Sequence, residues 1–256
     1  MTRDIFVHLL PVLFQPDDLR DGTAVVIDVL RASTTITHAL AAGANAVIPC
    51  EEVEEARQIA ANLPATEVVL GGERDSKKIE GFDLDNSPLQ YTPETVGGKT
   101  VVFTTTNGTR ALSRSRQAER ILLGSFVNLN AVIESLAEDN RALHLVCAGT
   151  RGQISAEDVL CAGAIAEGLA TTLGSTSRRH DQTRIAMDFF AANMQDESSL
   201  LESLRESLGG RNLHRLGFDA DIERAATRDL FDLVPRYSPQ TGRIEVERQR
   251  TIKPNM

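Results

Sequence analysis

Short apolar runs alternate with amphipathic stretches along the first two-thirds of the chain. Apolar runs too short for helices predict strands at Ile5–Phe14, Thr23–Val29, Ala46–Pro49, Val68–Leu70, Thr100–Thr104, Arg120–Leu123 and Leu143–Cys147. Apolar residues at helical spacing predict helices at Thr34–Ala42, Glu52–Asn62, Gly108–Arg116, Asn128–Glu138 and Ser155–Thr172. This alternation indicates an α/β fold with three layers, in which helices cover both faces of a mixed, largely parallel sheet.

A weak internal repeat accompanies this pattern. Residues 25–27 (Val-Val-Ile) align with residues 101–103 (Val-Val-Phe), and each strand runs into a Thr-rich loop, a short helix, a second strand and another helix. If the repeat reflects two related β-α units, both polar loops are expected at the same edge of one sheet. The alternative, that any two β-α units look this similar, stays open.

The pattern changes in the last third of the chain. The polar segment 175–181 suggests a linker, which divides the chain into an α/β core at residues 1–174 and a C-terminal helical or cap extension at residues 175–256. We expect the extension to pack on the core. Its predicted elements are a long helix near residues 184–208, a break at Gly209-Gly210, a short helix at Asp219–Arg228 and a strand at Arg243–Val246.

Composition and charge narrow the classes of function. The chain has 256 residues, of which 41% are hydrophobic and 25% charged, as in ordinary globular proteins. Its formal net charge of −9 argues against a nucleic-acid partner, because phosphate-backbone binding depends on clustered Lys and Arg. No run approaches the roughly 20 apolar residues of a membrane span. Three cysteines without paired spacing fit a reducing compartment, so we expect a soluble cytoplasmic protein without a membrane partner.

Candidate chemistry gathers after the predicted strands, where open α/β sheets bind ligands. After the second strand, Asp28 closes an apolar run, and burying its carboxylate is costly without a cation or a hydrogen-bond donor. Arg31 follows in the loop, and Ser33 or Thr34 can cap the next helix. An anion would be favoured there by Arg31 and by the helix dipole, although capping alone also accounts for the two hydroxyls.

A long irregular stretch follows the strand that ends near residue 70. Loops of this length inside compact domains are usually functional or disordered. Glu73 and Asp83 are candidate metal ligands in this stretch. The substrate-binding candidates here are Arg74, Asn86 and Ser87. A surface cluster of salt bridges would leave a similar pattern, so this alternative stays open.

The loop after the strand Thr100–Thr104 is a candidate phosphate-binding loop. It offers hydroxyl groups, an Asn-Gly turn and a following Arg, and it lacks the Gly-Lys-Ser/Thr of a nucleotide P-loop. Its candidate ligand-binding residues are Thr105, Thr106, Asn107, Gly108 and Arg110.

A fourth polar loop follows Cys147. Gln153 occupies the position at which a cysteine phosphatase would have its Arg, so we interpret Cys147 as a small apolar residue. Gly149 and Arg151 are candidate substrate-binding residues. Glu157 and Asp158 fall in the first turn of the next helix and are candidate magnesium ligands, whereas Ser155 with Asp158 also fits a helix capping box.

The four loops together predict one mixed-charge site on an acidic protein. Such a site suits a multiply charged anion bridged to a hard cation. The prediction requires that guanidinium and carboxylate groups from the four loops meet in one cleft, namely Arg31, Arg74, Arg110 and Arg151 with Asp28, Glu73, Asp83, Glu157 and Asp158.

These clusters resemble the 2-phosphosulfolactate phosphatase family over about residues 1–235. The segments that carry the resemblance are Ile27–Thr35, Gly72–Arg74, Gly81–Pro88, Thr105–Arg110, Cys147–Gly149 and Glu157-Asp158. The resemblance implies an α/β fold with a mixed sheet, Mg²⁺ dependence, and hydrolysis of 2-phosphosulfolactate to sulfolactate and phosphate, a step toward coenzyme M. It leaves the physiological substrate of this member open.

Our hypothesis from the sequence is magnesium-assisted phosphoryl transfer to water. Asp28 with Glu157, Asp158 or both would hold the metal. Arg31, Arg110 and the N–H groups of residues 105–108 would bind the phosphate of a small anionic substrate. Arg74 and Arg151 would bind its carboxylate and sulfonate.

Several alternatives remain open at this point. Asp28 itself is a possible nucleophile, which would form an aspartyl-phosphate. A non-catalytic sensor of a phosphorylated metabolite and an assembly protein are the rival functions. The sequence leaves the oligomeric state open, a homo-oligomer included.

Overall fold

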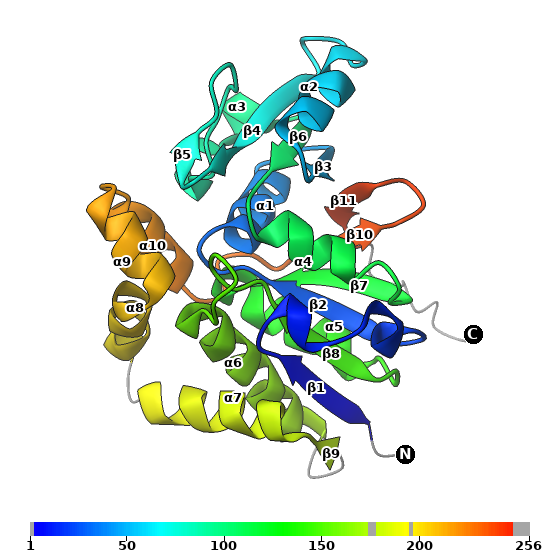
Figure 1. Ribbon diagram of the computed structural model, residues 1–256, viewed down its shortest axis with the longest axis vertical. Helices are drawn as coiled ribbons and strands as arrows, with labels where there is room; N and C mark the ends of the chain where they lie inside the picture. The colour runs from blue at the N-terminus through cyan, green and yellow to red at the C-terminus, as the bar shows by residue number, and fades with distance from the viewer. Residues whose placement is uncertain (1–2, 174–177, 195–196, 248–256) are drawn as a thin grey trace, which may run out of the picture.

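The structure, a computed structural model, describes residues 3–173, 178–194 and 197–247. The strands are β1 (Asp4–His8), β2 (Thr23–Ile27), β3 (Ala46–Cys50), β4 (Val68–Arg74), β5 (Lys77–Lys78), β6 (Thr100–Thr104), β7 (Arg120–Gly124), β8 (Leu143–Cys147), β9 (Arg178–Arg179), β10 (Pro235–Ser238) and β11 (Arg243–Val246). The helices are α1 (Ala32–Ala41), α2 (Val53–Ala61), α3 (Pro93–Val96), α4 (Gly108–Arg114), α5 (Leu129–Ala137), α6 (Ala156–Leu173), α7 (Asp181–Asn193), α8 (Glu197–Glu206), α9 (Leu208–Arg215) and α10 (Asp219–Ala226). The predicted α/β class with a mixed, largely parallel sheet is confirmed (Figure 1).

The sheet has two halves that are parallel except for the edge strand β5, and an antiparallel hairpin joins them. Its strand order is β5-β4-β6-β3-β11-β10-β7-β2-β8-β1-β9. We call β5, β4, β6 and β3 the β6 half, and β7, β2, β8, β1 and β9 the β2 half. Strands β10 and β11 lie between them and make the three antiparallel pairings that separate β3 from β7. The two halves therefore run in opposite directions.

The strand order reflects an exchange between two chain segments. The first segment is β2-α1-β3-α2-β4 and the second is β6-α4-β7-α5-β8. Strand β2 lies between β7 and β8 of the second segment, and β6 lies between β3 and β4 of the first. Two related β-α units would produce this symmetrical order. The expectation that both polar loops lie along one edge of the sheet is wrong, because the two halves run in opposite directions. The loop after β2 and the loop after β6 meet instead where the two halves join.

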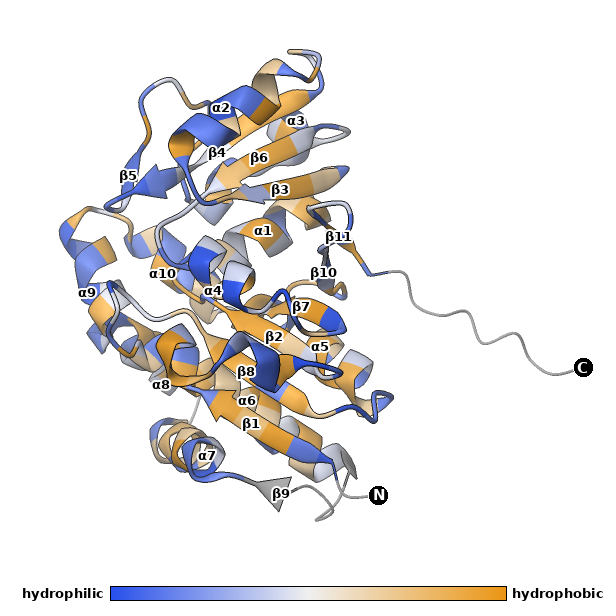
Figure 2. Cartoon of the chain, turned by 45° about the vertical axis from the view of Figure 1, so that its right-hand side comes forward, coloured by the Kyte–Doolittle hydropathy of each residue, from blue (hydrophilic) through white to orange (hydrophobic). Residues whose placement is uncertain are grey.

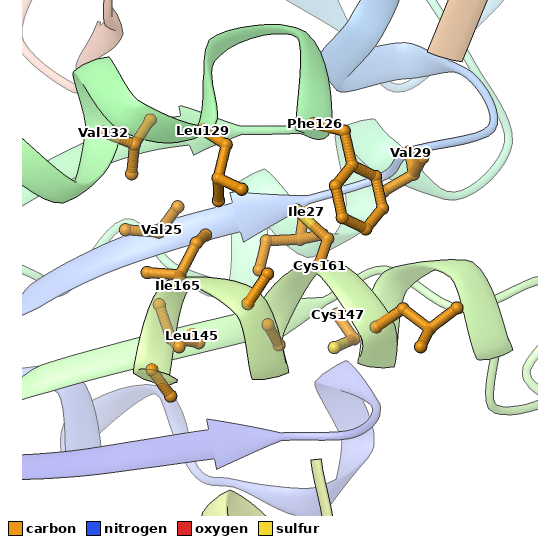
Figure 3. Close-up of a cluster of buried hydrophobic side chains, with 14 of the residues drawn as sticks. Val25, Ile27, Val29, Phe126, Leu129, Val132, Leu145, Cys147, Cys161 and Ile165 are labelled. Carbon is orange, nitrogen blue, oxygen red and sulfur yellow. The ribbon is translucent and has the colours of Figure 1, made fainter. Parts of the chain in front are cut away.

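Alternating side chains of the central strands feed two cores, one on each face of the sheet. Val25 and Ile27 of β2 pack into the core formed with α5 and α6, where Ile165 contributes from α6 (Figure 3). Ala24 and Val26 of the same strand enter the other core with α1 and α4. Figure 2 shows that the strands are largely hydrophobic whereas α9 is mainly hydrophilic. The polar loop that follows β2 is therefore held by a strand fixed on both faces.

The C-terminal third differs from the prediction in three respects. The long helix predicted at residues 184–208 is wrong, since α7 and α8 are separate helices. The predicted break at Gly209-Gly210 is also wrong, since both glycines lie in α9. Strand β11 is confirmed at Arg243–Val246, but the hairpin with β10 enters the middle of the sheet, which local patterning did not indicate.

Close approaches show why glycines stand inside α9. A Cβ added to Gly209 would lie 2.2 Å from Glu157 Oε1, and one added to Gly210 would lie 1.8 Å from the carbonyl oxygen of Leu204. The Gly210 N–H donates to Ser207 Oγ at the helix N-terminus over 2.9 Å. The glycines thus let α9 pack closely against α6 and α8.

Two further segments complete the comparison. The predicted opening strand is shorter, because β1 ends at His8 before a 3-10 turn at Pro11–Leu13. The predicted linker at 175–181 falls partly on residues 174–177, which lie outside the described residues. Within the described ranges, none of the helices is both long enough and apolar enough to cross a lipid bilayer.

Candidate active site

Asp28 lies directly after the fully buried strand β2 and is itself only 7% exposed. Its Oδ1 accepts a hydrogen bond from the Ala32 N–H over 3.2 Å, and its own N–H donates to Ser33 Oγ. Burial raises the pKa of the Asp28 carboxyl to about 7, and the charges of Glu73 and Glu157 act in the same direction. The Ala32 hydrogen bond and Arg31 oppose this shift. A buried acid that ionises near neutral pH is suited to bind a cation or to act on a substrate.

Glu157 and Asp158 lie in the first turn of α6, after β8. Asp158 accepts hydrogen bonds from the N–H groups of Val29 (2.9 Å) and Gly149 (3.0 Å), and so fixes the loops after β2 and β8 to each other. Glu157 is 1% exposed, and its Oε2 has no hydrogen-bond partner among the described residues. Burial raises the pKa of both carboxyls, and the neighbouring acids raise that of Asp158 further. The β2 half therefore gathers buried acids whose charge is only partly compensated, by Arg31 near Asp28 and by Arg211 near Glu157.

The β6 half contributes Glu73, each of whose carboxylate oxygens accepts a hydrogen bond from a backbone N–H group. Glu73 Oε1 accepts from the Thr106 N–H over 2.9 Å, and Oε2 accepts from the Ser76 N–H over 2.6 Å. These bonds join the end of β4 to the loop after β6. Glu73 thus links the turn after β4 to the loop after β6, and it also lines the same cavity as Asp28.

The loop after β6 packs against Asp28 through Gly108. A Cβ added to Gly108 would lie 2.8 Å from Asp28 Oδ2 and 3.3 Å from Thr105 Oγ1. Asn107 Oδ1 accepts a hydrogen bond from the Arg151 N–H over 3.3 Å. The loops after β2, β6 and β8 therefore meet where the two halves of the sheet join.

Arg31 is buried and its charge is already paired. Its Nη1 lies 2.7 Å from Asp221 Oδ2, and its guanidinium stacks 4.5 Å from the ring centroid of Phe218. Asp221 Oδ1 accepts from Ser87 Oγ over 2.6 Å. Asp221 thus anchors the loop after β2 and the Ser87 segment to α10. Sequence reasoning missed Asp221, because acids in the first turn of a helix are ordinary.

A cavity of ≈ 50 Å³ lies at this junction. The predicted site residues that line it are Asp28, Arg31, Glu73, Asn86, Thr105, Thr106, Asn107 and Arg151. Gly209, Asn212 and Leu213 of α9 also line it, and sequence reasoning missed them because the Gly-Gly pair indicated a break. The cavity thus brings together four of the nine charged side chains that the sequence prediction placed in one cleft, namely Asp28, Glu73, Arg31 and Arg151.

Other predicted site residues support the loops from outside the cavity. Ser33 and Thr34 lie inside α1, which begins at Ala32, and their hydroxyls donate to carbonyl oxygens of the preceding loop and strand. Neither caps the helix as expected. Ser87 is engaged by Asp221, Gly149 by Asp158, and Gly108 packs against Asp28.

Five charged candidates do not line the cavity, contrary to the prediction: Glu157 and Asp158, which are buried in the first turn of α6, and Arg74, Asp83 and Arg110. Arg74 donates to Thr104 Oγ1 over 2.8 Å and to the Glu73 carbonyl oxygen over 3.0 Å. Asp83 is exposed, and its Oδ2 accepts from the Leu70 N–H over 2.8 Å. Arg110 is exposed on α4 and does not line the cavity. Adjacency in sequence to a cavity residue therefore does not place a side chain in the cavity: Arg74 and Asp83 are engaged by other groups, and Arg110 lies on α4.

The oxygen atoms at the junction are chemically suited to Mg²⁺. Glu157 Oε2, Asn86 Oδ1 and Thr105 Oγ1 are buried, and none has a hydrogen-bond partner among the described residues. In the same part of the chain, no group of three or more His, Cys, Asp or Glu side chains converges closely enough to hold a metal by itself. Magnesium usually takes one or two carboxylates and completes its shell with water and substrate phosphate. The residues therefore fit an ion shared between protein and substrate.

An α/β fold with buried acids and a neighbouring arginine at strand-end loops defines an enzyme-like site for an anionic ligand. The model of the 2-phosphosulpholactate phosphatase family matches residues 8–240, and the chain belongs to this family. This confirms the resemblance found in the sequence.

Curated relatives span nearly the whole chain. A probable 2-phosphosulfolactate phosphatase of Caldanaerobacter subterraneus subsp. tengcongensis is 45% identical over 86% of this chain and 89% of its own length. One from Thermotoga maritima is 44% identical over 83% of this chain and 88% of its own. One from Carboxydothermus hydrogenoformans is 37% identical over 95% and 99%, respectively. The family model, which matches residues 8–240, covers most of the α/β core and helices α7 to α10.

Proposed function

We propose that this chain is a magnesium-dependent phosphatase that hydrolyses 2-phosphosulfolactate, or a similar small phosphorylated 2-hydroxy acid, to the hydroxy acid and phosphate. The observation that carries the proposal is the set of buried acids at the junction of the two half-sheets, with Asp28 facing the cavity and Glu157 directly behind α9. Family membership supplies the substrate class.

Asp28 and Glu157 are the side chains that would hold Mg²⁺, with Asn86 and Thr105 as neutral oxygen donors. A bound Mg²⁺ would neutralise phosphate charge and stabilise charge on the leaving oxygen. The carboxyls of Asp28 and Glu157 are costly to ionise in their buried positions, since burial raises the pKa of both. A cation offsets that cost, so the ionised acids and the metal are expected to be mutually dependent.

Protein groups around the cavity orient the substrate for the reaction. The loop after β6 is held rigidly by Glu73 and Asn107, so its position does not have to be set when the substrate binds. Arg151 brings positive charge to the cavity wall. In the hydrolysis, the ester P–O bond breaks and the oxygen of a water molecule bonds to phosphorus. The alcohol oxygen of the product gains a proton from that water.

Asp28 has one of two roles in that step. It either positions water and takes up its proton, or attacks phosphorus itself to give an aspartyl-phosphate that water then hydrolyses. Rapid-quench labelling with radioactive substrate separates the two, because only the second traps phosphate on the protein.

The reaction is proposed to take place in the cytoplasm. Cys50, Cys147 and Cys161 are all buried and free, which fits a reducing compartment.

A panel assay tests the proposal. Phosphate release would be measured for 2-phosphosulfolactate, 2-phospholactate and 2-phosphoglycerate, each with Mg²⁺ and with EDTA. We expect release that requires Mg²⁺ and is fastest with 2-phosphosulfolactate. Failure of all three esters to release phosphate would contradict the phosphatase, and full activity in EDTA would contradict the role of the metal.

A further inference from the structure

A second cavity, of ≈ 270 Å³, adjoins the acidic one and is lined by arginines. The two cavities share Thr150, Arg151 and Asn212 in their walls, so both lie next to the same three residues. The second cavity is completed by Leu208, Arg211 and Arg215 of α9. We call Arg151, Arg211 and Arg215 the arginine groove. None of the acidic side chains described lines it.

The charges of the arginine groove are weakly compensated. Arg151 Nη2 lies 3.8 Å from Asp75 Oδ1, and both side chains are more than half exposed, so this pair is screened by water. Arg211 donates to the carbonyl oxygen of Glu206, and Arg215 donates to Asn212 Oδ1 over 2.5 Å. Among the described residues, neither of these two guanidinium groups lies within ion-pair distance of a carboxylate, although the charge of Arg211 opposes the rise that burial causes in the pKa of Glu157. The groove therefore focuses positive charge on a chain whose net charge is −9.

Helix α9 holds the groove at a fixed distance from the acids. Arg211 and Arg215 are four residues apart and share one helix face. The same helix packs on the acidic site, since a Cβ on Gly209 would lie 2.2 Å from Glu157 Oε1. Helices α8, α9 and α10 stand together as an arm beside the β2 half (Figure 1). A ligand that spans both cavities would therefore meet a cation-binding end and a guanidinium-lined end.

We infer that the arginine groove binds the anionic group of the substrate that lies farthest from the phosphate, which is the sulfonate of 2-phosphosulfolactate. The inference rests on the proposed function and deepens it, because it makes a second strong anion the determinant of specificity. Guanidinium groups donate in a planar fork that suits the oxygens of a sulfonate or carboxylate. A phosphate ester with an uncharged far end has nothing to offer the groove and is expected to be a poor substrate.

Two substrates that differ only in the far group test the inference. 2-Phospholactate keeps the phosphate and the carboxylate of 2-phosphosulfolactate but lacks its sulfonate. The double variant Arg211→Gln/Arg215→Gln should lose about 10²-fold in kcat/KM with 2-phosphosulfolactate, mainly through KM, since each lost charged hydrogen bond is worth about a factor of ten or more. It should change less than about threefold with 2-phospholactate. Arg57→Gln, which removes one exposed guanidinium on α2, is the matched control.

The outcomes separate this inference from the proposed function. Equal losses with both esters, or unchanged selectivity for the sulfonated one, would overturn the inference while leaving the phosphatase intact. If the wild-type protein hydrolyses neither ester, calorimetric binding of sulfolactate still decides the matter. The inference then requires that wild type binds sulfolactate at least about tenfold more tightly than the double variant, and equal binding overturns it.

Discussion

The two halves of the sheet meet at one cavity but contribute opposite kinds of chemistry. The β2 half brings Asp28, Glu157 and Asp158, which are buried and whose pKa values are raised by burial. The β6 half brings Glu73, whose oxygens accept backbone hydrogen bonds, and the small and hydroxylated residues of the loop after β6. One half thus holds buried acids with raised pKa values, and the other shapes the space around Asp28.

The difference shows how a symmetrical framework becomes an asymmetric site. Both β2 and β6 are fully buried strands followed by a polar loop and a helix. Strand β2 is followed directly by an acid, Asp28. After β6, Gly108 has no Cβ and therefore leaves room for the Asp28 side chain. Neither loop forms the site alone, so changes in the two loops should differ in size and kind.

The largest effect is expected from the acid itself. Replacing Asp28→Asn keeps the shape of the side chain but removes the charge that binds a cation or acts on the phosphate, so kcat should fall by about 10³-fold or more. Phosphate release from 2-phosphosulfolactate measures it, with circular dichroism to check the fold. Asp83→Asn, an exposed acid away from the cavity, should stay within about threefold of wild type. Comparable activity in the two variants would contradict the role given to Asp28.

Breaking the anchor of the loop after β2 should come next. Asp221→Asn removes one partner of a buried ion pair with Arg31, which typically costs about 3–5 kcal/mol of unfolding free energy. Urea unfolding measures the change. Asp219 on the same helix has a half-exposed side chain, so Asp219→Asn should leave the free energy of unfolding nearly unchanged. A similar loss in both variants would show that Asp221 is no anchor.

The loop after β6 should respond to volume. Gly108→Ala would place a Cβ 2.8 Å from Asp28 Oδ2 and 2.7 Å from Ala32 Cβ, so the two loops must move apart. Displacements of this order cost up to about 10²-fold in rate, and we expect a loss of about 10–100-fold in kcat. Ser113 on α4, the helix that begins at Gly108, does not line the cavity, so Ser113→Ala serves as the control. Wild-type kinetics in Gly108→Ala would show that the close packing is not needed.

The smallest effect is expected from Arg110, a charged residue after β6 whose side chain lies outside the cavity. Arg110 is exposed and does not line the cavity, so Arg110→Gln should change kcat/KM by less than about twofold. Steady-state kinetics with 2-phosphosulfolactate gives the answer. A loss of tenfold or more would restore Arg110 to the phosphate site suggested by the sequence.

The local sequence pattern identified site residues that lie close to the ends of predicted strands. It missed residues that are distant in sequence and reach the site only through the fold. Asp28, Glu73 and Asn107 were found because polar residues that follow apolar strands lie at the edge of the sheet where ligands bind. Asp221 was missed because its partner Arg31 lies more than a hundred residues away in sequence. The strand hairpin β10–β11 was missed for a similar reason, since nothing local shows that it enters the middle of the sheet.

The direction in which a loop side chain points could also not be predicted from the sequence. Arg74, Asp83 and Arg110 stand beside true cavity residues, yet backbone geometry turns each of them away. Gly209-Gly210 indicated a break because glycine weakens isolated helices, whereas the close approach of α6 and α8 requires glycine there. Tertiary contacts decide both cases.

The central claim is that the buried acids of the β2 half bind a cation. The most direct test is to measure the melting temperature of the protein as a function of Mg²⁺ concentration. Because the pKa of Asp28 is raised from 3.8 to about 7, ionising it destabilises the metal-free fold progressively as pH rises through this range, and the cost is complete above it. At pH 8, Mg²⁺ should therefore raise the melting temperature of the wild-type protein and leave that of Asp28→Asn nearly unchanged. Equal shifts in the two proteins, or none in wild type, would contradict the account.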